Sequence, residues 1–279
     1  MFQNSKFAII GPGVMGRAIA FSLIHTGGID PQNITLAGPN PAKLEQLSGE
    51  LGVCAQIDNA EAAHSADVVI LSVKPQRLEQ VSKSLKGSLG EDALVISILA
   101  DVSTATLIEK LGTQRVIRAM PNTPAQIGMG ITVWTKTPQV NEDEKNLAAQ
   151  IIRTLGNEIF VEDESYLDMA TALSGTGPAY VFLFMEAMID AGVHMGFPRR
   201  MAEQLVVQTI RGSTEFYERN HEHPAQLRND VTSPGGTSAE ALYYLEKAGF
   251  RTAISRAIWA AYQRSKELGE GKLKESLES

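Results

Sequence analysis

A glycine-rich loop near the N-terminus has the spacing that binds the pyrophosphate of a dinucleotide. Its residues, Gly11–Gly16 (GPGVMG), fit the pattern G-x-G-x-x-G, and they follow the apolar run Lys6–Ile10 and open a helical pattern. In this context the first glycine allows a tight turn, the second lets the backbone approach the pyrophosphate, and the third lets helix and strand pack closely. The N–H groups of the helix N-terminus would face the anion. The alternative is a glycine-rich turn without a ligand.

The residues after the second predicted strand, Ile34–Ala37, indicate which dinucleotide the loop would hold. An NAD site usually presents an acidic residue there to the ribose 2′-hydroxyl, but no carboxylate lies between Asp30 and Glu45. Asn40 can donate to a 2′-phosphate, and Lys43 can add positive charge. We therefore expect NADP, with NADPH preferred and NAD possible, although an Asn before a proline is also an ordinary helix cap.

Three further loops carry polar residues near the ends of predicted strands, where a doubly wound sheet binds its ligands. Asn59 begins a predicted helix, so it either caps that helix or contacts the adenine or ribose. Lys74, in the run Ser72–Pro75, lies near the phosphate or the nicotinamide ribose unless it is a solvated surface lysine. Asn122 follows one proline and shortly precedes another, which makes a rigid loop with its side chain at the same crevice.

A second glycine loop lies far along the chain. Thr232–Ser238 (TSPGGTS) precedes the helical run Ala239–Leu245, so it offers hydroxyls and free backbone N–H groups at a helix N-terminus. Such a loop can bind a carboxylate or a small phosphate. A Ser/Thr helix cap is the alternative, although capping alone does not require Pro-Gly-Gly. The loop predicts an acidic substrate beside the dinucleotide.

Composition and charge limit the other functions that we expect. The histidines fall outside every loop above, and His221 and His223 have no further ligands nearby in the sequence, so no metal site is expected. A net charge of −7 without a Lys/Arg stripe argues against a nucleic-acid partner. The single cysteine, Cys54, suits a reducing compartment. No apolar run reaches the roughly 18 residues of a membrane span, so we expect a soluble, cytoplasmic protein with no membrane partner.

The first half of the chain contains the elements that must position these loops. Short apolar runs alternate there with helical patterns, which is typical of a parallel sheet covered by helices on both faces. The predicted strands are Lys6–Ile10, Ile34–Ala37, Asp67–Val73, Leu94–Leu99 and Arg115–Ala119, with later edge strands at Gly130–Trp134 and Ile159–Val161. Only helical patterns follow Asp163. We therefore predict an α/β Rossmann-type doubly wound sheet in residues 1–162 and an all-α dimerisation and substrate domain in residues 163–279.

One predicted helix in the second half, Pro178–Met195, is apolar on almost every face. A helix that is apolar all round must be buried all round, and the remaining helices offer few layers to cover it. We infer that a second subunit covers it, in a homodimer or a larger assembly of dimers. The alternative is the central helix of a monomeric bundle.

Taken in order, these loops resemble those of one family, the Δ1-pyrroline-5-carboxylate reductases. The resemblance rests on Gly11–Gly16, Val73–Pro75, Ala119–Pro124, Ser174–Tyr180 and Val231–Thr237, and it covers nearly the whole chain. It implies an N-terminal Rossmann domain and an all-helical dimerisation domain. It also implies NAD(P)H-dependent reduction of pyrroline-5-carboxylate to L-proline, the last step of proline biosynthesis.

The resemblance further implies site residues, carried over by position. Cofactor contacts would fall on Ile10, Gly11, Pro12, Gly13, Val14, Met15, Asn40, Asn59, Ser72, Val73, Lys74, Pro75, Ile98, Leu99 and Ala100. Substrate contacts would fall on Asn122, Gly236, Thr237 and Ser238. Backbone N–H groups around Gly236–Ser238 would hold the substrate carboxylate, and the hydroxyls of Thr237 and Ser238 would serve the reaction, with Ser238 at the ring nitrogen.

The chain departs from the family pattern at four places. Val14 stands where the family commonly has Asn, and Asp101 stands where it commonly has Gly, which puts a carboxylate close to the cofactor crevice. Ser238 replaces a second Thr and keeps the hydroxyl. Asn229-Asp230 stands where some members read Asp-Asn, which puts a contact by Asp230 in doubt.

Three rival functions share this architecture. The imine of pyrroline-5-carboxylate can arrive protonated, so the absence of His from the loops fits its reduction, but an imine reductase for a related cyclic imine acid would look similar. Hydroxyacid dehydrogenases of this build use a lysine on the long interdomain helix, and Leu173–Gly192 contains none. A nucleotide-binding regulatory protein without catalysis would have lost the substrate loop, which is intact here.

Overall fold

The computed structural model describes residues 2–270, which form two compact units. The larger unit comprises the chain up to Thr176 and the segment from Ala261, and the smaller one is Gly177–Ala260. The second division falls inside the last helix, α12 (Phe250–Gly269), so this helix belongs to both units. The domain boundary expected between residues 162 and 163 stays a prediction.

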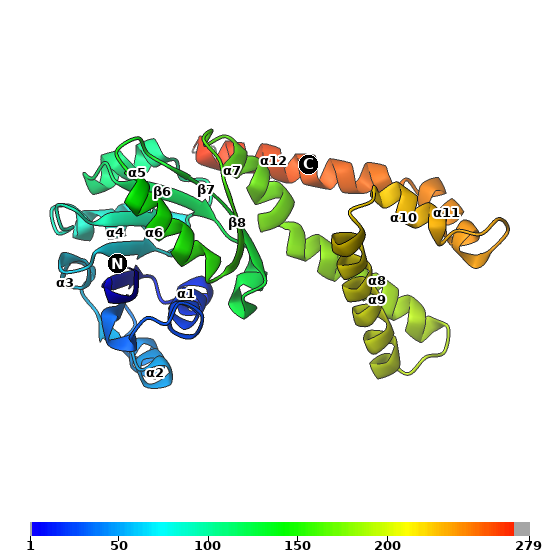
Figure 1. Cartoon of the computed structure of the whole chain (residues 1–279), viewed down its shortest axis with the longest axis horizontal. Coiled ribbons are helices and arrows are strands. Elements are labelled where there is room, and N and C mark those ends of the chain that lie inside the picture. The colour runs from blue at the N-terminus through cyan, green and yellow to red at the C-terminus, as the bar shows by residue number, and fades with distance from the viewer. Residues whose placement is uncertain (1, 271–279) are drawn as a thin grey trace, which may run out of the picture. The chain divides into compact units, whose positions relative to one another are not determined.

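The larger unit is built on one eight-stranded sheet with the strand order β3-β2-β1-β4-β5-β6-β7-β8. Figure 1 labels β6, β7 and β8 of this sheet. Neighbouring strands are parallel except β6 and β7, which are antiparallel. The strands are β1 (Phe7–Ile10), β2 (Ile34–Ala37), β3 (Cys54–Gln56), β4 (Val68–Leu71), β5 (Leu94–Ser97), β6 (Val116–Met120), β7 (Gly130–Lys136) and β8 (Gly156–Phe160). The expected Rossmann-type sheet is confirmed.

Two strands differ from the expectation. β3 was not expected, because its three residues are exposed or half-buried and form no apolar run. β7 was expected at an edge of the sheet, but it lies between β6 and β8, and β8 alone is the edge strand on that side. The connection Pro121–Met129 between β6 and β7 is too short for the crossover that a parallel pair needs, so β7 runs antiparallel.

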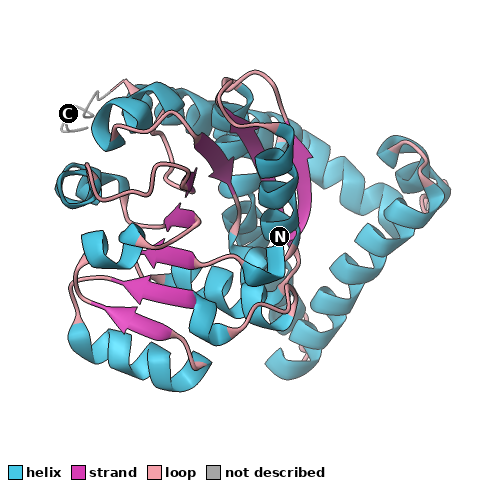
Figure 2. Ribbon diagram, turned by 60° about the vertical axis from the view of Figure 1, so that its left-hand side comes forward, coloured by secondary structure: helices cyan, strands magenta, loops and turns pink. Residues whose placement is uncertain are grey.

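Helices cover both faces of the sheet, as Figure 2 shows. One core contains apolar side chains of α1 (Val14–His25), α2 (Pro41–Leu51) and α6 (Glu142–Arg153), and the other contains those of α3 (Asn59–His64), α4 (Leu78–Leu85) and α5 (Thr104–Leu111). In β1, Ile9 belongs to the first core and Ile10 to the second. Because successive strand side chains point to opposite faces, β1 is buried on both sides, and the loop after it begins from a fully buried strand.

The smaller unit is helical throughout the part that the structure describes. It contains α8 (Gly177–His194), α9 (Arg199–Asn220), α10 (Pro224–Asp230), α11 (Thr237–Lys247) and the first part of α12. α7 (Tyr166–Ala170) and a π-helical turn, Thr171–Gly175, precede α8 along the chain. α8 packs against α9, where Gly192 lies close to Ala202.

The apolar side chains of the smaller unit are mostly exposed. Only Ala202 and Val206 are buried hydrophobic residues among the described residues of this unit, whereas Phe182 of α8 is 62% exposed and Trp259 of α12 is 60% exposed. This arrangement contradicts the alternative of a central helix in a monomeric bundle, because such a helix would be covered within the chain.

One helical stretch, Tyr166–His194, is long and apolar enough by length and composition alone to cross a membrane, and no other described helix is. The stretch is not an uninterrupted apolar run, because Asp168, Glu186 and Asp190 lie within it. One such helix is weak evidence for a membrane, because the helix of a buried protein interface has a similar composition.

Candidate dinucleotide and substrate sites

The loop after β1 has the shape that a dinucleotide site requires. Gly11 has a φ of 101°, and a Cβ on it would lie 2.7 Å from Val73 Cγ1. A Cβ on Gly16 would collide with Gly11 O and lie 2.6 Å from Ser72 Oγ. Ser72 Oγ also donates a 2.6 Å hydrogen bond to Gly11 O. Both glycines are therefore needed for the close packing of the turn, α1 and the end of β4.

Gly13 stands at the open side of the same loop. No heavy atom lies within 4 Å of a Cβ placed on it. Gly13 is the N-cap of α1, and no side chain caps this helix. An anion seated there would meet open space, backbone donors and the positive end of the helix dipole. These residues fit the pyrophosphate of a dinucleotide, and Val14, whose side chain is 64% exposed, leaves the backbone donors accessible.

The end of β2 carries the asparagine that was expected to choose the nucleotide. Asn40 caps α2, because its Oδ1 accepts a 3.1 Å hydrogen bond from Lys43 N. The cap uses the carbonyl of the side chain, so its Nδ2 group can still donate to a phosphate. Gly38 lies against Pro12, since a Cβ on it would be 2.6 Å from Pro12 Cδ. This contact brings the β2 loop beside the glycine loop.

A pocket of about 460 Å³ lies between the loops that follow β2, β3 and β4. Asn59 and Val73 line it, together with Pro39, Ile57, Arg77, Gln80, Val81 and Ser84. Asn59 Nδ2 donates to Ser84 Oγ at 3.2 Å, and its buried Oδ1 has no hydrogen-bond partner among the described residues. The idea that Asn59 caps its helix is wrong: Asp58 is the cap, and it accepts from Ala60 N at 2.8 Å.

The residues after β4 include a second basic side chain, Arg77, that was not expected from the sequence. Lys74 begins a short 3₁₀ turn, Pro75–Arg77, and its side chain is exposed. Arg77 lies at the end of that turn and lines the pocket beside Asn59. The sequence could have indicated Arg77, because it lies three residues after Lys74, just beyond a predicted strand. Basic residues at this edge of a doubly wound sheet often contact phosphates.

Both the nitrogen and the oxygen of the Asn122 side-chain amide, after β6, form hydrogen bonds within the chain. Its Nδ2 donates to Ser174 O at 3.2 Å, and its Oδ1 accepts from Ile131 N at 3.0 Å. Ser174 belongs to the π-helical turn, so the side chain fastens the β6 loop to β7 and to that turn. One amide hydrogen of Asn122 remains to meet a ligand.

The loop Ile98–Ala100 follows β5 and ends at a strained residue. Asp101 has a φ of 60°, which is uncommon for a residue other than glycine. Its Oδ1 accepts a 2.5 Å hydrogen bond from Ser265 Oγ in α12. Burial raises the pKa of the Asp101 carboxyl, and the charge of Asp168 raises it further, while the Ser265 hydrogen bond and the positive charges of Arg118 and Arg264 oppose the rise.

A buried guanidinium near this loop was also missed. Arg118 of β6 is only 5% exposed, and it pairs with Glu164 at 3.0 Å and with Asp168 at 3.1 Å. Glu164 in turn accepts from the backbone N and the Oγ1 of Thr104, at 2.8 and 2.7 Å, at the start of α5. No local motif indicates this cluster, because the two residues of each hydrogen-bonded pair lie 46 to 60 positions apart in the sequence.

The second glycine loop precedes α11 in the helical unit. Gly235 has a φ of 70°, and Gly236 is the N-cap of α11 without any side-chain cap. The alternative of a Ser/Thr cap is therefore wrong for this helix. No hydrogen bond of the Thr237 or Ser238 hydroxyl is found among the described residues, and Thr237 is exposed while Ser238 is half-buried. The first turn of α11 thus presents free N–H groups and two hydroxyls, which suits a carboxylate.

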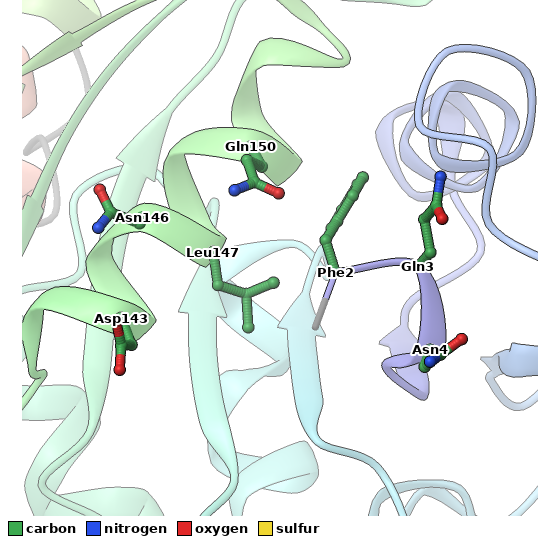
Figure 3. A pocket seen from close by; sticks show the side chains of 7 residues that line it. All are labelled: Phe2, Gln3, Asn4, Asp143, Asn146, Leu147 and Gln150. Carbon is green, nitrogen blue, oxygen red and sulfur yellow. The ribbon is translucent and has the colours of Figure 1, made fainter.

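The predicted cofactor residues and Asn122 thus share the carboxyl-terminal edge of the strands, whereas Gly236, Thr237 and Ser238 lie in the other unit. A different hollow, of about 550 Å³, is lined by residues of the N-terminal turn Phe2–Asn4 and of α6 (Figure 3). The turn Phe2–Asn4 precedes β1 along the chain, and none of the predicted site residues lines this hollow. In the described part of the chain, no group of three or more His, Cys, Asp or Glu residues is placed to hold a metal.

Comparison with known proteins supplies a family. Residues 164–268 match the family described as pyrroline-5-carboxylate reductase dimerisation, and residues 6–101 match the one described as NADP oxidoreductase, coenzyme F420-dependent. Among curated relatives, pyrroline-5-carboxylate reductase of Synechocystis sp. is 43% identical over 96% of this chain and 100% of its own length.

Solved structures agree with this similarity. Pyrroline carboxylate reductase of Plasmodium falciparum, solved with NADP bound, is 33% identical with a TM-score of 0.87 over 96% of this chain and 99% of that one. Pyrroline-5-carboxylate reductase of Coxiella burnetii is 38% identical with a TM-score of 0.85 over 95% of this chain and 98% of that one. The identity and the coverage extend through both compact units, so this chain belongs to the pyrroline-5-carboxylate reductase family.

Proposed function

We propose that this chain reduces 1-pyrroline-5-carboxylate to L-proline with NADPH, the last step of proline biosynthesis. The observation that carries the proposal is the similarity to pyrroline-5-carboxylate reductases over 96% of the chain, at 43% identity with the Synechocystis relative. The matched ranges 6–101 and 164–268 include both glycine loops. A dinucleotide cradle and an uncapped helix N-terminus with free hydroxyls are what such a reaction requires.

The cofactor contacts fall on the carboxyl-terminal edge of the sheet. The backbone of Ile10–Met15 holds the pyrophosphate, and Asn40 Nδ2 with Lys43 receives the 2′-phosphate. Asn59 and Arg77 line the adenosine pocket. The runs Ser72–Pro75 and Ile98–Ala100 lie toward the nicotinamide half. Since no carboxylate replaces Asn40, NADPH is the preferred form.

The substrate contacts fall on the loop before α11. Backbone N–H groups of Thr237 and Ser238 hold the substrate carboxylate beside Gly236, because this helix N-terminus has no side-chain cap and the Gly236 N–H already donates to Ser233 O at 3.0 Å. The Ser238 hydroxyl accepts a hydrogen bond from the protonated ring nitrogen, with Thr237 beside it, and Asn122 donates its remaining amide hydrogen. When bound, the reduced nicotinamide supplies a hydride to the C=N carbon. The protein orients the two reactants, which is a large catalytic contribution in itself.

We propose a cytoplasmic homodimer, or a larger assembly of such dimers, without nucleic acid or membrane partners. The match to a dimerisation family over residues 164–268 supports the dimer, and so do the exposed apolar residues of α8. The net charge of −7 and the single cysteine support the rest. A second copy of this chain is the partner that best covers α8.

Steady-state NADPH oxidation with 1-pyrroline-5-carboxylate tests the proposal. We expect turnover with L-proline as the product, slower turnover with NADH at equal concentration, and a kcat/KM for 1-pyrroline, which lacks the carboxylate, lower by about 10- to 100-fold. NADPH binding without turnover would indicate a regulatory protein instead. Faster turnover of another cyclic imine acid would replace the substrate.

A further inference from the structure

We propose that Asp101 is a positioning residue for the cofactor loop Ile98–Ala100, and that it acts through its hydrogen bond to Ser265 of α12. The proposal rests on the function above, since that function assigns this loop to the cofactor. Asp101 is not itself among the proposed cofactor contacts, so the function above does not assign it a role.

The loop is fastened to the sheet at its beginning. Ile98 N donates to Leu71 O at 3.0 Å, and Leu99 N donates to Ser97 Oγ at 3.3 Å. Leu99 itself is buried in the core under α4 and α5. The beginning of the loop therefore moves with β4 and β5. Its end, at Ala100 and Asp101, has no such backbone hydrogen bond within the described chain, and the Asp101 side chain provides the hydrogen bond there.

The partner of Asp101 is well placed to act as an anchor. Ser265 is only 3% exposed, and its Oγ donates to Asp101 Oδ1 at 2.5 Å. Gly269 lies nearby, since a Cβ on it would be 3.5 Å from Asp101 O. The last turns of α12 thus bind the side chain of Asp101 and pass close to its backbone. Both residues belong to the larger unit.

The positive φ of Asp101 indicates that its side chain has a role that glycine could not fill. A glycine adopts a φ of 60° without strain, whereas an aspartate does so less readily. The chain therefore keeps a disfavoured residue where glycine would fit the backbone better. What aspartate adds is a hydrogen-bond acceptor for Ser265 Oγ, in the field of Asp168, Arg118 and Arg264. Strain that persists beside a ligand loop is commonly linked to that loop's function.

The expected effect follows from the fraction of molecules whose loop has the binding shape. An apparent Kd equals the intrinsic Kd divided by that fraction. If loss of the anchor leaves the loop in that shape for about 10–30% of the time, the Kd for NADPH rises about 3- to 10-fold. Because saturating NADPH restores the shape, kcat should stay within about two-fold of wild type while the KM for NADPH rises.

Calorimetric titration of the full-length protein with NADPH tests the anchor in four single variants and one double variant. Asp101→Gly removes the carboxylate and the strain together, and Ser265→Ala removes only the donor. Asp101→Asn keeps an acceptor and tolerates a positive φ, so it should rescue the affinity. Ser82→Ala is the matched control, because Ser82 is also a buried helical serine but donates to Glu79 O in α4.

We expect a 3- to 10-fold rise in Kd for Asp101→Gly and Ser265→Ala, and no further rise when the two are combined, since they break the same bond. Asp101→Asn and Ser82→Ala should bind as wild type does. Wild-type affinity in both Asp101→Gly and Ser265→Ala would overturn the inference, and so would an additive loss in the double variant. Absence of NADPH binding by the wild type would instead overturn the proposed function.

Discussion

The three glycines of the loop after β1 have different reasons to be glycine. Gly11 and Gly16 are enclosed by neighbouring atoms, so any side chain there disturbs the packing of α1 on β4. Gly13 faces open space at a φ of −79°, which any residue can adopt. Packing therefore does not require a glycine at position 13, whereas the approach of the proposed pyrophosphate would.

Gly13→Asp should accordingly separate binding from folding. The new carboxylate would lie where the pyrophosphate is expected, so NADPH binding should be abolished, while the free energy of unfolding stays within about 0.5 kcal/mol of wild type. Gly16→Ala is the matched contrast, because its Cβ would collide with Gly11 O and destabilise the fold. Calorimetry and urea unfolding measure the two quantities. Undiminished NADPH affinity in Gly13→Asp would mean that the loop is only a turn.

Asn40→Asp should change the choice of nucleotide. Asp is as good an N-cap as Asn, so α2 should remain capped through Lys43 N. The added charge lies beside the proposed 2′-phosphate, and the Kd for NADPH should therefore rise by about ten-fold or more while that for NADH changes little. Asn40→Ser keeps a cap without the charge and serves as the control. Equal losses for NADPH and NADH would remove Asn40 from this role.

At the scale of the elements, the buried strands were predictable and the exposed ones were not. β1, β4 and β5 are buried at every position, so β1 and β4 show as uninterrupted apolar runs and β5 as an apolar run that contains only one polar residue, Ser97. β3 has no buried residue, and its pairing with β2 is decided by the sheet and not by its own sequence. The glycine loops were predictable for the same reason as the strands, because their chemistry is local in sequence.

Contacts between distant segments account for what the sequence could not predict at the site. Asn122 was expected to contact the substrate, and the sequence did not show that its amide joins Ser174 and Ile131. Asp101 looked like a carboxylate at the crevice, but it bonds to Ser265, which is 164 positions away. Arg118 was an ordinary strand residue in the sequence and is the centre of an ionic cluster in the fold. Residue types alone do not reveal such partners.

The segment that carries Asp101 should make stability depend on pH. Its raised pKa means that folding favours the protonated carboxyl, so the stabilisation is complete below the ordinary value of 3.8 and is lost as the pH rises through the folded pKa. The charged groups around it are Asp168 of α7, Arg118 of β6 and Arg264 of α12. As the pH rises over this range, the free energy of unfolding of the wild type should fall relative to that of Asp101→Asn, whose side chain does not titrate. Urea unfolding at pH 4 to 8 measures it, and parallel curves would contradict the assignment.

At the scale of the whole molecule, the smaller unit lacks a core of its own. Ala202 and Val206 are its buried hydrophobic residues in the described chain, while large side chains such as Phe182 and Trp259 are exposed. Exposed apolar patches of this kind mark protein interfaces. The match of residues 164–268 to a dimerisation family agrees with this argument, which started in the sequence from the all-round apolar helix.

Phe182→Asp should therefore disrupt the assembly. Burying an unpaired carboxylate at a subunit interface is strongly unfavourable, so the variant should be dissociated or insoluble at micromolar concentration. Met129→Asp makes the same change at a 75% exposed residue of the larger unit and should leave the mass unchanged. Light scattering with size-exclusion chromatography compares them. A well-behaved wild-type monomer, or an unaffected Phe182→Asp dimer, would contradict the assignment of this face.

The central claim is that the uncapped N-terminus of α11 binds the substrate that the bound nucleotide reduces. The most direct test is kcat/KM for 1-pyrroline-5-carboxylate in Ser238→Ala, with the Kd for NADPH measured alongside. Losing a hydrogen bond to a charged nitrogen costs about 1.5–3 kcal/mol, so we predict a decrease of roughly 10- to 100-fold with the NADPH affinity unchanged. A wild-type kcat/KM in Ser238→Ala, and likewise in Gly236→Val, would show that the loop only begins a helix.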